Sequence, residues 1–441
     1  MDDAHVDVRE SAGSARAGIV SLYPCEATAL RRDVVVTGIG VLLPGAAGPG
    51  EFWEHLESGT SQLATIPDPA DPDRTVIAGR VSRHAEDPLL SEVPGAHLEH
   101  YSREVRCYLA SVLQARDRAG LANGEVSGDR VGIYDGSSRG AVEFWDGKIR
   151  NENGGVADGL YSRKDILNAI NGQTVGIAAA LFKTTGPALA VGGSCAAGLI
   201  ATTHACRDIE DDRVDIAFAT GHDFALTPAL FAMYGEAKLL RRDAATKVQS
   251  GGEGSLAFSE GAVTVVLENR ESALSRGAGI LARVAGHGYC NEGKNPFTVD
   301  ITGESQARLM NAVLEGAGVP TDEVHFVIGH GNGLTNCDRS ERDYMRLLFG
   351  DRADEVRFVS TKPVYGHTLG GSGSVNLAAA AMMVRLRQPL PAYDWMDPQI
   401  DASAPVGAGR SGEVDRGIVF TCGMGGLMAA CLLERDQGAR S

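Results

Sequence analysis

Short apolar runs alternate with longer amphipathic stretches along most of this chain. The runs end in glycine or polar residues, which is typical of buried strands. Strands are expected at 33–40, 130–134, 188–191, 215–219, 262–267, 279–284, 325–330, 357–360 and 417–420. Helices are expected at 52–58, 306–317, 340–349 and 373–388, and in the small-residue stretch that ends near 205. This alternation favours an α/β fold with parallel-rich sheets covered by helices, with reactive side chains in the loops that follow the strands.

The first expected strand ends in Gly38 and Gly40, like the start of a dinucleotide-binding loop. The third glycine of that motif falls on Leu43, and Pro44 follows it. The dinucleotide signature is therefore incomplete, and we do not expect this site.

Cys195 stands out because of its setting. It follows the apolar run 188–191 and the pair Gly192 and Gly193, and it precedes small residues compatible with a helix. We therefore expect a tight strand-to-helix turn, where the helix N-terminus favours the thiolate. A lone buried cysteine is more often structural, so its role depends on other residues.

Composition excludes several classes of partner. The 441 residues are 43% apolar and 22% charged, with 56 glycines, as in many α/β enzymes. The formal net charge is −16 and no long Lys/Arg run occurs, which argues against nucleic acid or an anionic membrane surface as partner. The pairs Arg103/Arg106 and Arg241/Arg242 are candidates for a small basic patch that would bind an acidic carrier protein.

The eight cysteines are scattered, without a CxxC spacing or a Cys/His ligand pair. Neither a metal site nor a disulfide framework is expected, which fits a reducing compartment. No stretch is apolar enough to span a bilayer, and the acidic N-terminus lacks a secretory core, so we expect a cytoplasmic protein. Residues 1–30 are expected to form a disordered or loosely docked extension.

Two histidines lie in glycine-rich segments after expected strands. His330 ends the run 325–330 and is followed by Gly-Asn-Gly, while His367 follows Lys362 and precedes a small-residue helix start. A single histidine is more often structural or solvent-exposed. Two of them at strand exits, together with the cysteine turn, indicate a catalytic centre.

These motifs resemble those of the β-ketoacyl synthases, the condensing enzymes of fatty-acid and polyketide assembly. The resemblance covers 34–434, nearly the whole chain. Its further marks are Val34-Val35-Val36-Thr37-Gly38-Ile39-Gly40, Ser259-Glu260-Gly261-Ala262, Asp338 and Glu341 after His330, and Gly423-Met424-Gly425-Gly426. It implies a thiolase-like α/β fold of two related halves in α-β-α-β-α layers, with the cysteine in 31–275 and both histidines in 276–441. The segment 330–341 is similar to discrete, type II synthases of actinomycete polyketide pathways.

The resemblance assigns roles to the reactive residues. Cys195 would accept the acyl group, because a thiol attacks and leaves at neutral pH without a strong base. His330 and His367 would stabilise the enolate formed when a malonyl-type extender loses CO₂. Lys362 would tune His367, with Glu260 as the buried partner of Lys362.

The same resemblance implies the substrate contacts and partners. The amides of Cys195 and Met424 would form the oxyanion hole, and Asn332, Leu334, Met424 and Gly425 would line the path of the phosphopantetheine arm. No metal or redox cofactor is required. The expected partners are an acyl carrier protein and a second subunit, either an identical chain or a related one such as a chain-length factor.

Several positions depart from the family pattern. The family's Asp-Thr-Ala before the cysteine reads Gly192-Gly193-Ser194, the two threonines of HGTGT are Asn332 and Leu334, and the gating phenylalanine is Met424. A flexible methionine in place of a rigid ring predicts an altered acyl pocket around an intact catalytic core. We therefore expect specialised metabolism more than housekeeping fatty-acid synthesis.

Four functions remain open. The favoured one is decarboxylative condensation. The second is acyl transfer from Cys195 to another acceptor without decarboxylation, which the changes at Asn332 and Leu334 keep open. The third is a non-catalytic partner subunit, against which the retained Cys195 argues. The last is an unrelated Cys/His hydrolase. The segment 192–196 lacks the final glycine of the GxSxG motif, and no acidic residue stands out as the third member of a catalytic triad.

Overall fold

The computed structural model describes residues 31–121, 126, 128–151, 162–242, 255–393 and 414–438. The predicted extension 1–30 lies outside these residues. None of the helices in these ranges is both long and apolar enough to cross a membrane.

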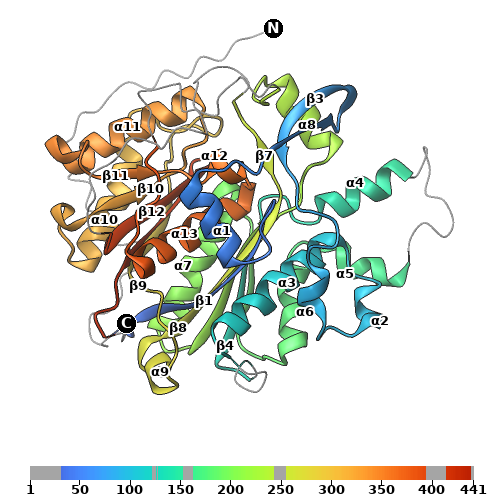
Figure 1. Ribbon diagram of the computed structural model, residues 1–441, viewed down its shortest axis with the longest axis horizontal. Coiled ribbons are helices and arrows are strands. Elements are labelled where there is room, and N and C mark those ends of the chain that lie inside the picture. The colour runs from blue at the N-terminus through green and yellow to red at the C-terminus, as the bar shows by residue number, and fades with distance from the viewer. Residues whose placement is uncertain are drawn as a thin grey trace, which may run out of the picture. The chain divides into compact units, whose positions relative to one another are not determined.

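Within the described residues, ten strands form one mixed sheet (Figure 1). In sheet order they are β11 (Arg357–Val359), β10 (Phe326–Ile328), β12 (Arg416–Gly423), β13 (Leu427–Glu434), β9 (Ala282–Asn291), β1 (Val34–Leu42), β8 (Gly261–Asn269), β6 (Ile216–Asp223), β4 (Val131–Gly136) and β5 (Ala188–Val191). The three strands at each end are parallel, whereas the central pairs are antiparallel. The expectation of a parallel-rich sheet is wrong for the centre, where β13 follows β12 through a tight turn that permits only antiparallel pairing.

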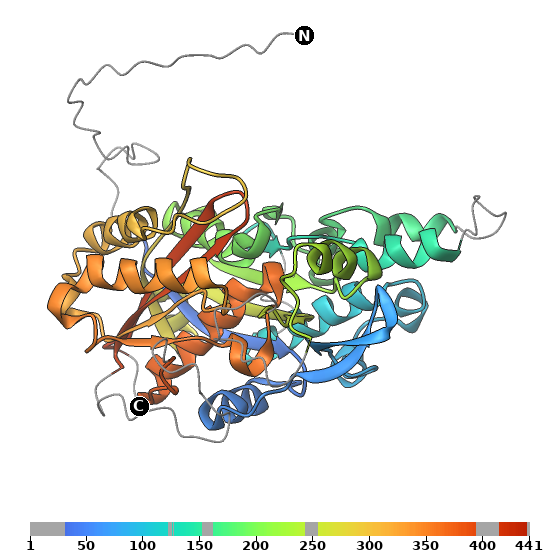
Figure 2. The same ribbon diagram turned by 90° about the horizontal axis from the view of Figure 1, so that it is seen from above.

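The sheet consists of two halves with the same strand order. β5, β4, β6, β8 and β1 in the first half correspond to β11, β10, β12, β13 and β9 in the second. The halves join where β1 pairs with β9 over Val34–Val36 and Ala282–Val284. Elements of the first half, in green and cyan, and of the second, in orange and red, lie mostly at opposite ends in Figure 2. The two related halves are confirmed, while their boundary at residue 275 stays a prediction.

Helices cover the sheet and fill the space between its halves. Their bounds are α1 (Pro49–Ser58), α2 (Gly95–Leu98), α3 (Arg103–Arg118), α4 (Val142–Asn151), α5 (Ile166–Ala169), α6 (Gln173–Phe182), α7 (Ala197–Glu210), α8 (Pro228–Glu236), α9 (Arg270–Ser275), α10 (Glu304–Ala317), α11 (Thr335–Phe349), α12 (Lys362–Tyr365) and α13 (Ser372–Leu386). α3 packs on β1 and β8, and α10 packs on β9 and β13. α7 and α13 contact each other and strands of both halves. This is the expected α-β-α-β-α arrangement.

Small residues allow the two central helices to approach closely. A Cβ on Gly198 of α7 would lie 2.6 Å from Oγ of Ser374, and one on Gly373 of α13 would lie 2.7 Å from Cβ of Leu199. Such distances leave no room for a side chain at either glycine. The close crossing brings the N-terminal ends of α7 and α13 together.

The two glycines of the first strand serve packing. A Cβ on Gly40 would lie 1.9 Å from the carbonyl oxygen of Ser111, and one on Gly38 would lie 2.3 Å from that of Ala115. Both contacts are with the backbone of α3, so β1 needs glycine here for that helix to pack against it. This agrees with the absence of a dinucleotide motif.

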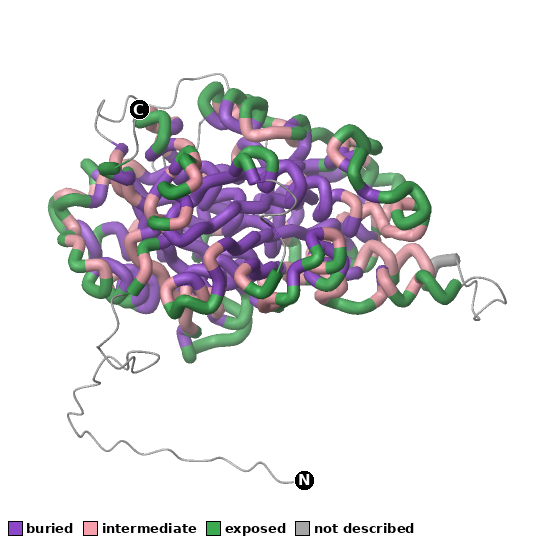
Figure 3. Tube along the Cα trace, turned by 90° about the horizontal axis from the view of Figure 1, so that it is seen from below, coloured by how far each residue is buried: buried purple, intermediate pink, exposed green. Residues whose placement is uncertain are grey.

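The core follows the strands. All residues of β1 and β8 are buried, and buried segments, drawn in purple, fill the interior in Figure 3. A smaller sheet of β2 (Ala64–Asp68), β3 (Asp71–Gly79) and β7 (Phe258–Ser259) adjoins it. Phe258 of β7 also forms a parallel bridge with His367, which fixes the backbone of this histidine against the small sheet.

Candidate active site

Cys195 lies where the sequence places it, in a turn between β5 and α7. Ser194–Ala196 form a short 3₁₀ turn that leads into the helix, and Ser194 has a φ of 51°. A non-glycine residue in this left-handed region costs about 1–2 kcal/mol, which the surrounding packing must offset. The Cys195 side chain is buried and lines a cavity.

His367 is the immediate partner of this thiol. Its Nε2 lies 3.2 Å from Sγ of Cys195, and its Nδ1 lies 2.9 Å from Oγ of Ser372. Its backbone is also held, because its N–H donates to the Ala257 carbonyl at 2.7 Å and its carbonyl accepts from the Ser259 N–H at 3.0 Å. The imidazole is therefore oriented from both sides with one nitrogen aimed at sulfur.

His330, two residues after the end of β10 and in the same half as His367, completes the constellation. Its ring stands at 89° to that of His367, with 5.2 Å between centroids. Its backbone N–H donates to Oε1 of Glu341 at 2.6 Å, and the Gly331 N–H donates to both oxygens of the same carboxylate. Nδ1 of His330 is buried and has no hydrogen-bond partner among the described residues. The Glu341 carboxylate thus holds the loop, while the imidazole keeps hydrogen-bonding capacity for a substrate.

Lys362 contacts the backbone of the His330 loop and not the imidazole rings. Its Nζ donates to the carbonyl oxygen of His330, and its electrostatic partner is Glu341. The expected pairing with Glu260 is wrong. Glu260 instead accepts from Nη2 of Arg103 at 2.6 Å and from the Val81 N–H at 2.9 Å. The bidentate guanidinium of α3 occupies this carboxylate, so Glu260 stabilises the packing of α3 and not the charge of Lys362.

Burial dominates the electrostatics of this site. It lowers the pKa of both His330 and His367 well below the usual value, and the nearby Lys362 charge lowers them further. Burial also raises the pKa of the Cys195 thiol, although Lys362 and the Ser194 hydroxyl oppose this. Desolvation therefore disfavours the thiolate that was expected at this helix N-terminus. The resting pair is a neutral thiol beside a neutral imidazole.

A cavity of about 490 Å³ opens onto these groups. Besides Cys195, His330 and His367, its wall includes three of the four expected arm-contact residues, Asn332, Leu334 and Met424. The fourth, Gly425, is not part of this wall. Its N–H donates to the Pro296 carbonyl at 3.1 Å, and its φ is 88°.

The altered residues in this wall have specific contacts. Oδ1 of Asn332 accepts the Leu334 N–H at 3.0 Å, so this amide oxygen is used within its own turn. Met424 is half-exposed, and Tyr234 donates its hydroxyl to the Met424 sulfur at 3.7 Å. A Cβ on the preceding Gly423 would lie 2.8 Å from the Cys195 nitrogen. The backbone of residues 423–424 is thus packed against Cys195, which is where an oxyanion hole would need it. That the backbone N–H groups of Cys195 and Met424 form this hole stays a prediction.

Two profiles of protein families cover most of the chain. The profile of the β-ketoacyl synthase N-terminal domain matches residues 31–273, and that of the C-terminal domain matches residues 281–393. The chain belongs to the β-ketoacyl synthase family. As a member of this family it is a transferase.

Relatives of this synthase match it over nearly their full length. The tetracenomycin polyketide synthase ketoacyl synthase alpha subunit of Streptomyces glaucescens is 27% identical over 93% of this chain and 99% of its own. A 3-oxoacyl-(acyl-carrier-protein) synthase 2 of Coxiella burnetii is 26% identical over 92% of this chain and 99% of its own. A solved structure described as the ishigamide ketosynthase/chain length factor superposes with a TM-score of 0.81 at 24% identity, over 92% of this chain and 100% of that one. The last comparison shows a shared fold.

Some residues of the synthase site were missed in the sequence. Glu341 was noticed only as part of a motif, yet it anchors the His330 loop. Asp223, at the end of β6, accepts from Ser138 and from the Gly370 N–H at 2.6 Å, and so ties a loop of the first half to the turn before α13. An acidic residue directly after a buried strand is the signal that could have identified it.

The basic residues proposed for carrier binding are engaged in ion pairs. Arg103 pairs with Glu260, Arg106 with Glu86 and Asp87, and Arg242 with Asp68. These pairs partly neutralise three of the four arginines, and the binding of a carrier protein at these positions stays a prediction.

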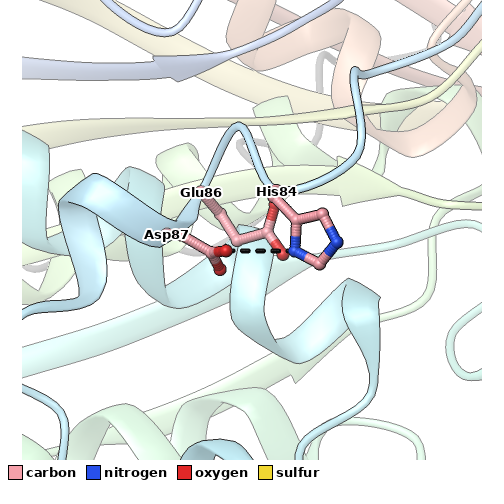
Figure 4. Close-up of side chains that lie close together, drawn as sticks. All are labelled: His84, Glu86 and Asp87. Atoms are coloured by element: carbon pink, nitrogen blue, oxygen red, sulfur yellow. Dashed lines mark hydrogen bonds and ion pairs between the residues drawn. The ribbon is translucent and has the colours of Figure 1, made fainter.

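One cluster of potential metal ligands occurs in the described residues, at His84, Glu86 and Asp87, whose ligand atoms lie within 4.8 Å of one another (Figure 4). Nδ1 of His84 lies 3.0 Å from Oδ2 of Asp87. Both carboxylates also pair with Arg106, whose single positive charge offsets part of their negative charge. The cluster is an ion-pair network of two exposed residues and the buried Glu86, and none of the three lines the cavity at Cys195.

Proposed function

We propose that this chain is a catalytic β-ketoacyl synthase that accepts an acyl group on Cys195 and condenses it with a malonyl-type extender. The observation that carries the proposal is the 3.2 Å contact between Cys195 Sγ and His367 Nε2, with His330 beside them in one cavity. A subunit that only shaped a tunnel would not need this arrangement.

In the first half-reaction, Sγ of Cys195 attacks the carbonyl carbon of a carrier thioester. The thiol proton moves to Nε2 of His367, and the carrier sulfur leaves and takes up a proton. The neutral imidazole suits this step because it has a free lone pair at Nε2 when Nδ1 carries the proton and donates to Ser372. The amides of Cys195 and Met424 would hold the oxyanion.

In the second half-reaction, the extender loses CO₂ and the electrons of the broken C–C bond form an enolate. N–H groups of His330 and His367 donate to the enolate oxygen. The carbanion carbon then attacks the Cys195 thioester, and the cysteine sulfur leaves. The hydroxyl of Ser372 can donate or accept, so it supports either tautomer of His367 in the two half-reactions.

The partners we propose are an acyl carrier protein and a second subunit. The solved structure of a type II polyketide ketosynthase in complex with its acyl carrier protein superposes on this chain with a TM-score of 0.81 at 20% identity. β5 is an edge strand whose residues Ala188, Leu189 and Ala190 are exposed. An unpaired apolar edge next to the nucleophile turn favours pairing with an identical or related chain. A type II polyketide pathway fits the alpha-subunit relatives.

The proposal is tested by loading the purified protein with an acyl-carrier thioester and measuring mass on Cys195. Malonyl-carrier is then added, and CO₂ release and product are followed. Acylation without CO₂ release would favour transfer to another acceptor, for which the engaged Asn332 and the apolar Leu334 are the supporting changes. Failure to acylate would favour a non-catalytic subunit. Cys195→Gln, which mimics the loaded state in this family, should retain decarboxylation and abolish condensation.

A further inference from the structure

The side chain of Met424 forms part of the wall of the cavity that contains Cys195. It is half-exposed, and the preceding residue, Gly423, packs against the Cys195 nitrogen. A methionine side chain has three rotatable bonds and adapts readily to its surroundings. The width of the cavity beside Sγ therefore depends on which way this side chain points.

The Tyr234 hydroxyl holds the Met424 side chain. It donates to the Met424 sulfur at 3.7 Å, and Tyr234 lines the same cavity. The two residues are 190 positions apart, and their contact joins α8 to the turn between β12 and β13. The Tyr234 ring packs edge-to-face on Phe258, with 4.6 Å between centroids and 82° between ring planes. Such a pair is favourable, so the hydroxyl has a defined position.

Arg139, in the loop after β4, contacts the same hydroxyl. Its Nη2 donates to the Tyr234 oxygen at 3.0 Å. Because this oxygen accepts from a guanidinium, its own hydrogen is free to point at the Met424 sulfur. A charged donor on the oxygen also polarises the O–H bond and strengthens the hydrogen bond that the hydroxyl donates. The three side chains thus form one hydrogen-bonded row, from Arg139 through Tyr234 to Met424.

We propose that Tyr234 and Arg139 are positioning residues that fix the Met424 side chain against α8, so that Cys195 accepts acyl groups that are unbranched beside the thioester. Without the hydrogen bond, Met424 can take other rotamers and make room for a branch next to Sγ. The inference rests on the proposed function where it concerns acyl groups, because these are loaded on the same cysteine. The position of Met424 is also testable without a carrier, since an alkylating reagent that reacts with Cys195 occupies the same cavity.

The first test compares iodoacetamide with 2-iodopropanamide, which carries a methyl branch on the carbon that bonds to sulfur. The ratio of the two rates at Cys195, followed by mass, cancels changes in thiol reactivity. Tyr234→Phe removes the hydroxyl and keeps the ring on Phe258, and it should lower the ratio of unbranched to branched rates by about two- to tenfold, the effect of one hydrogen bond. Arg139→Met removes the charged donor and should lower the ratio by a smaller factor.

The second test uses two carrier thioesters of equal carbon number, one straight and one branched beside the thioester. The wild-type protein should be acylated at least about tenfold faster by the straight chain, and Tyr234→Phe should reduce this preference. Tyr134→Phe is the matched control. It removes a hydroxyl that donates to Asp208 at 2.6 Å and lies outside the cavity wall, so both ratios should keep their wild-type values.

A double-mutant cycle isolates the contact itself. Met424→Leu has no sulfur, so adding Tyr234→Phe to it should leave the reagent ratio unchanged. The inference is overturned if Tyr234→Phe alone keeps the wild-type ratio, or if it lowers the ratio equally in the Met424→Leu background. Either result leaves the proposed function intact. A failure of both thioesters to acylate Cys195, with the reagents behaving as expected, would overturn the proposed function and the acyl preference while the position of Met424 stands.

Discussion

The ammonium group of Lys362 donates its hydrogen bond to the backbone carbonyl oxygen of His330 and not to either imidazole. The lysine therefore fixes the position of the His330 loop and contributes charge, while the ring nitrogens stay free for chemistry. The same charge lowers the pKa of the Cys195 thiol against the effect of burial.

Replacing Lys362 should shift the reactivity of Cys195 to higher pH. Lys362→Met removes a positive charge that favours the thiolate, so the thiol pKa rises and less thiolate is present at any given pH. We expect the pH profile for alkylation of Cys195 by iodoacetamide, followed by mass, to move upward by about one unit or more. Lys148→Met, which removes a lysine paired with Asp165, should leave the profile unchanged. Overlapping profiles for Lys362→Met and wild type would contradict this role.

Removing the imidazole of His367 should slow acylation itself. His367→Ala leaves the buried thiol without its proton acceptor, and a positioned general base contributes about 10²–10⁴ in rate. Single-turnover acylation from a carrier thioester measures the loss. His204→Ala is the matched control, because His204 is a half-buried histidine of α7 that packs beside Tyr289. A loss smaller than about tenfold would show that another group takes the proton.

The reactive residues could be identified from sequence because each has its own local signal. Cys195, His330 and His367 follow strands and are flanked by glycine or other small residues, and the topology of an α/β sheet brings such positions together. The partner of Lys362 could not be identified in this way. Which carboxylate approaches a buried ammonium depends on how α3 packs, and Glu260 is held by a residue 157 positions away. Glu341, and not Glu260, interacts electrostatically with Lys362.

The fold was predictable where the apolar pattern was continuous. β8 and α10 agree with the runs at 262–267 and 306–317. α3 was missed because its charged residues hide its apolar positions, although Glu104 and Arg116 are buried in it. β13 was missed because it follows the glycine-rich segment after Met424, and no polar alternation marks it. Ion pairs with distant residues stabilise α3, and pairing with neighbouring strands stabilises β13. Neither can be deduced from the local pattern of apolar and polar residues.

Asp338 should make stability fall as pH rises. Burial raises the pKa of its carboxyl to about 7, so the folded state holds this proton more tightly than the unfolded state does. The unfolded chain then loses the proton first, and the stabilising contribution disappears as pH rises from about 4 to about 7. Asp338→Asn cannot ionise. The free energy of unfolding of Asp338→Asn minus that of the wild type should therefore increase by up to about 3 kcal/mol between about pH 5 and about pH 8.

Urea unfolding at the two pH values measures this difference. Asp343→Asn, on the same helix α11 but half-exposed, is the control and should change little between them. A constant difference between Asp338→Asn and wild type would show that the Asp338 carboxyl is ionised in the folded state throughout this range.

The crossing of α7 and α13 should not tolerate a methyl group. In Gly198→Ala the new Cβ would lie 2.6 Å from Oγ of Ser374 and 2.9 Å from the carbonyl oxygen of Gly370, which forces the helices apart. We expect a loss of about 1–3 kcal/mol in the free energy of unfolding, measured by urea titration. Gly176→Ala is the control. It lies in the exposed part of α6 with its nearest neighbour atom at 3.6 Å, and should be stabilised by about 0.4–1 kcal/mol.

The shared strand order of the two halves has a consequence for how the nucleophile and its base are arranged. Cys195 lies between β5 and α7, and His367 lies between β11 and α13, so the two residues occupy corresponding loops of a duplicated unit. The reaction centre thus sits on the internal symmetry axis, like the shared site of a homodimer whose subunits have been joined into one polypeptide. A true homodimer would have to place the same residue in both loops. The fused repeat allows one loop to supply sulfur and its counterpart to supply the imidazole that receives its proton.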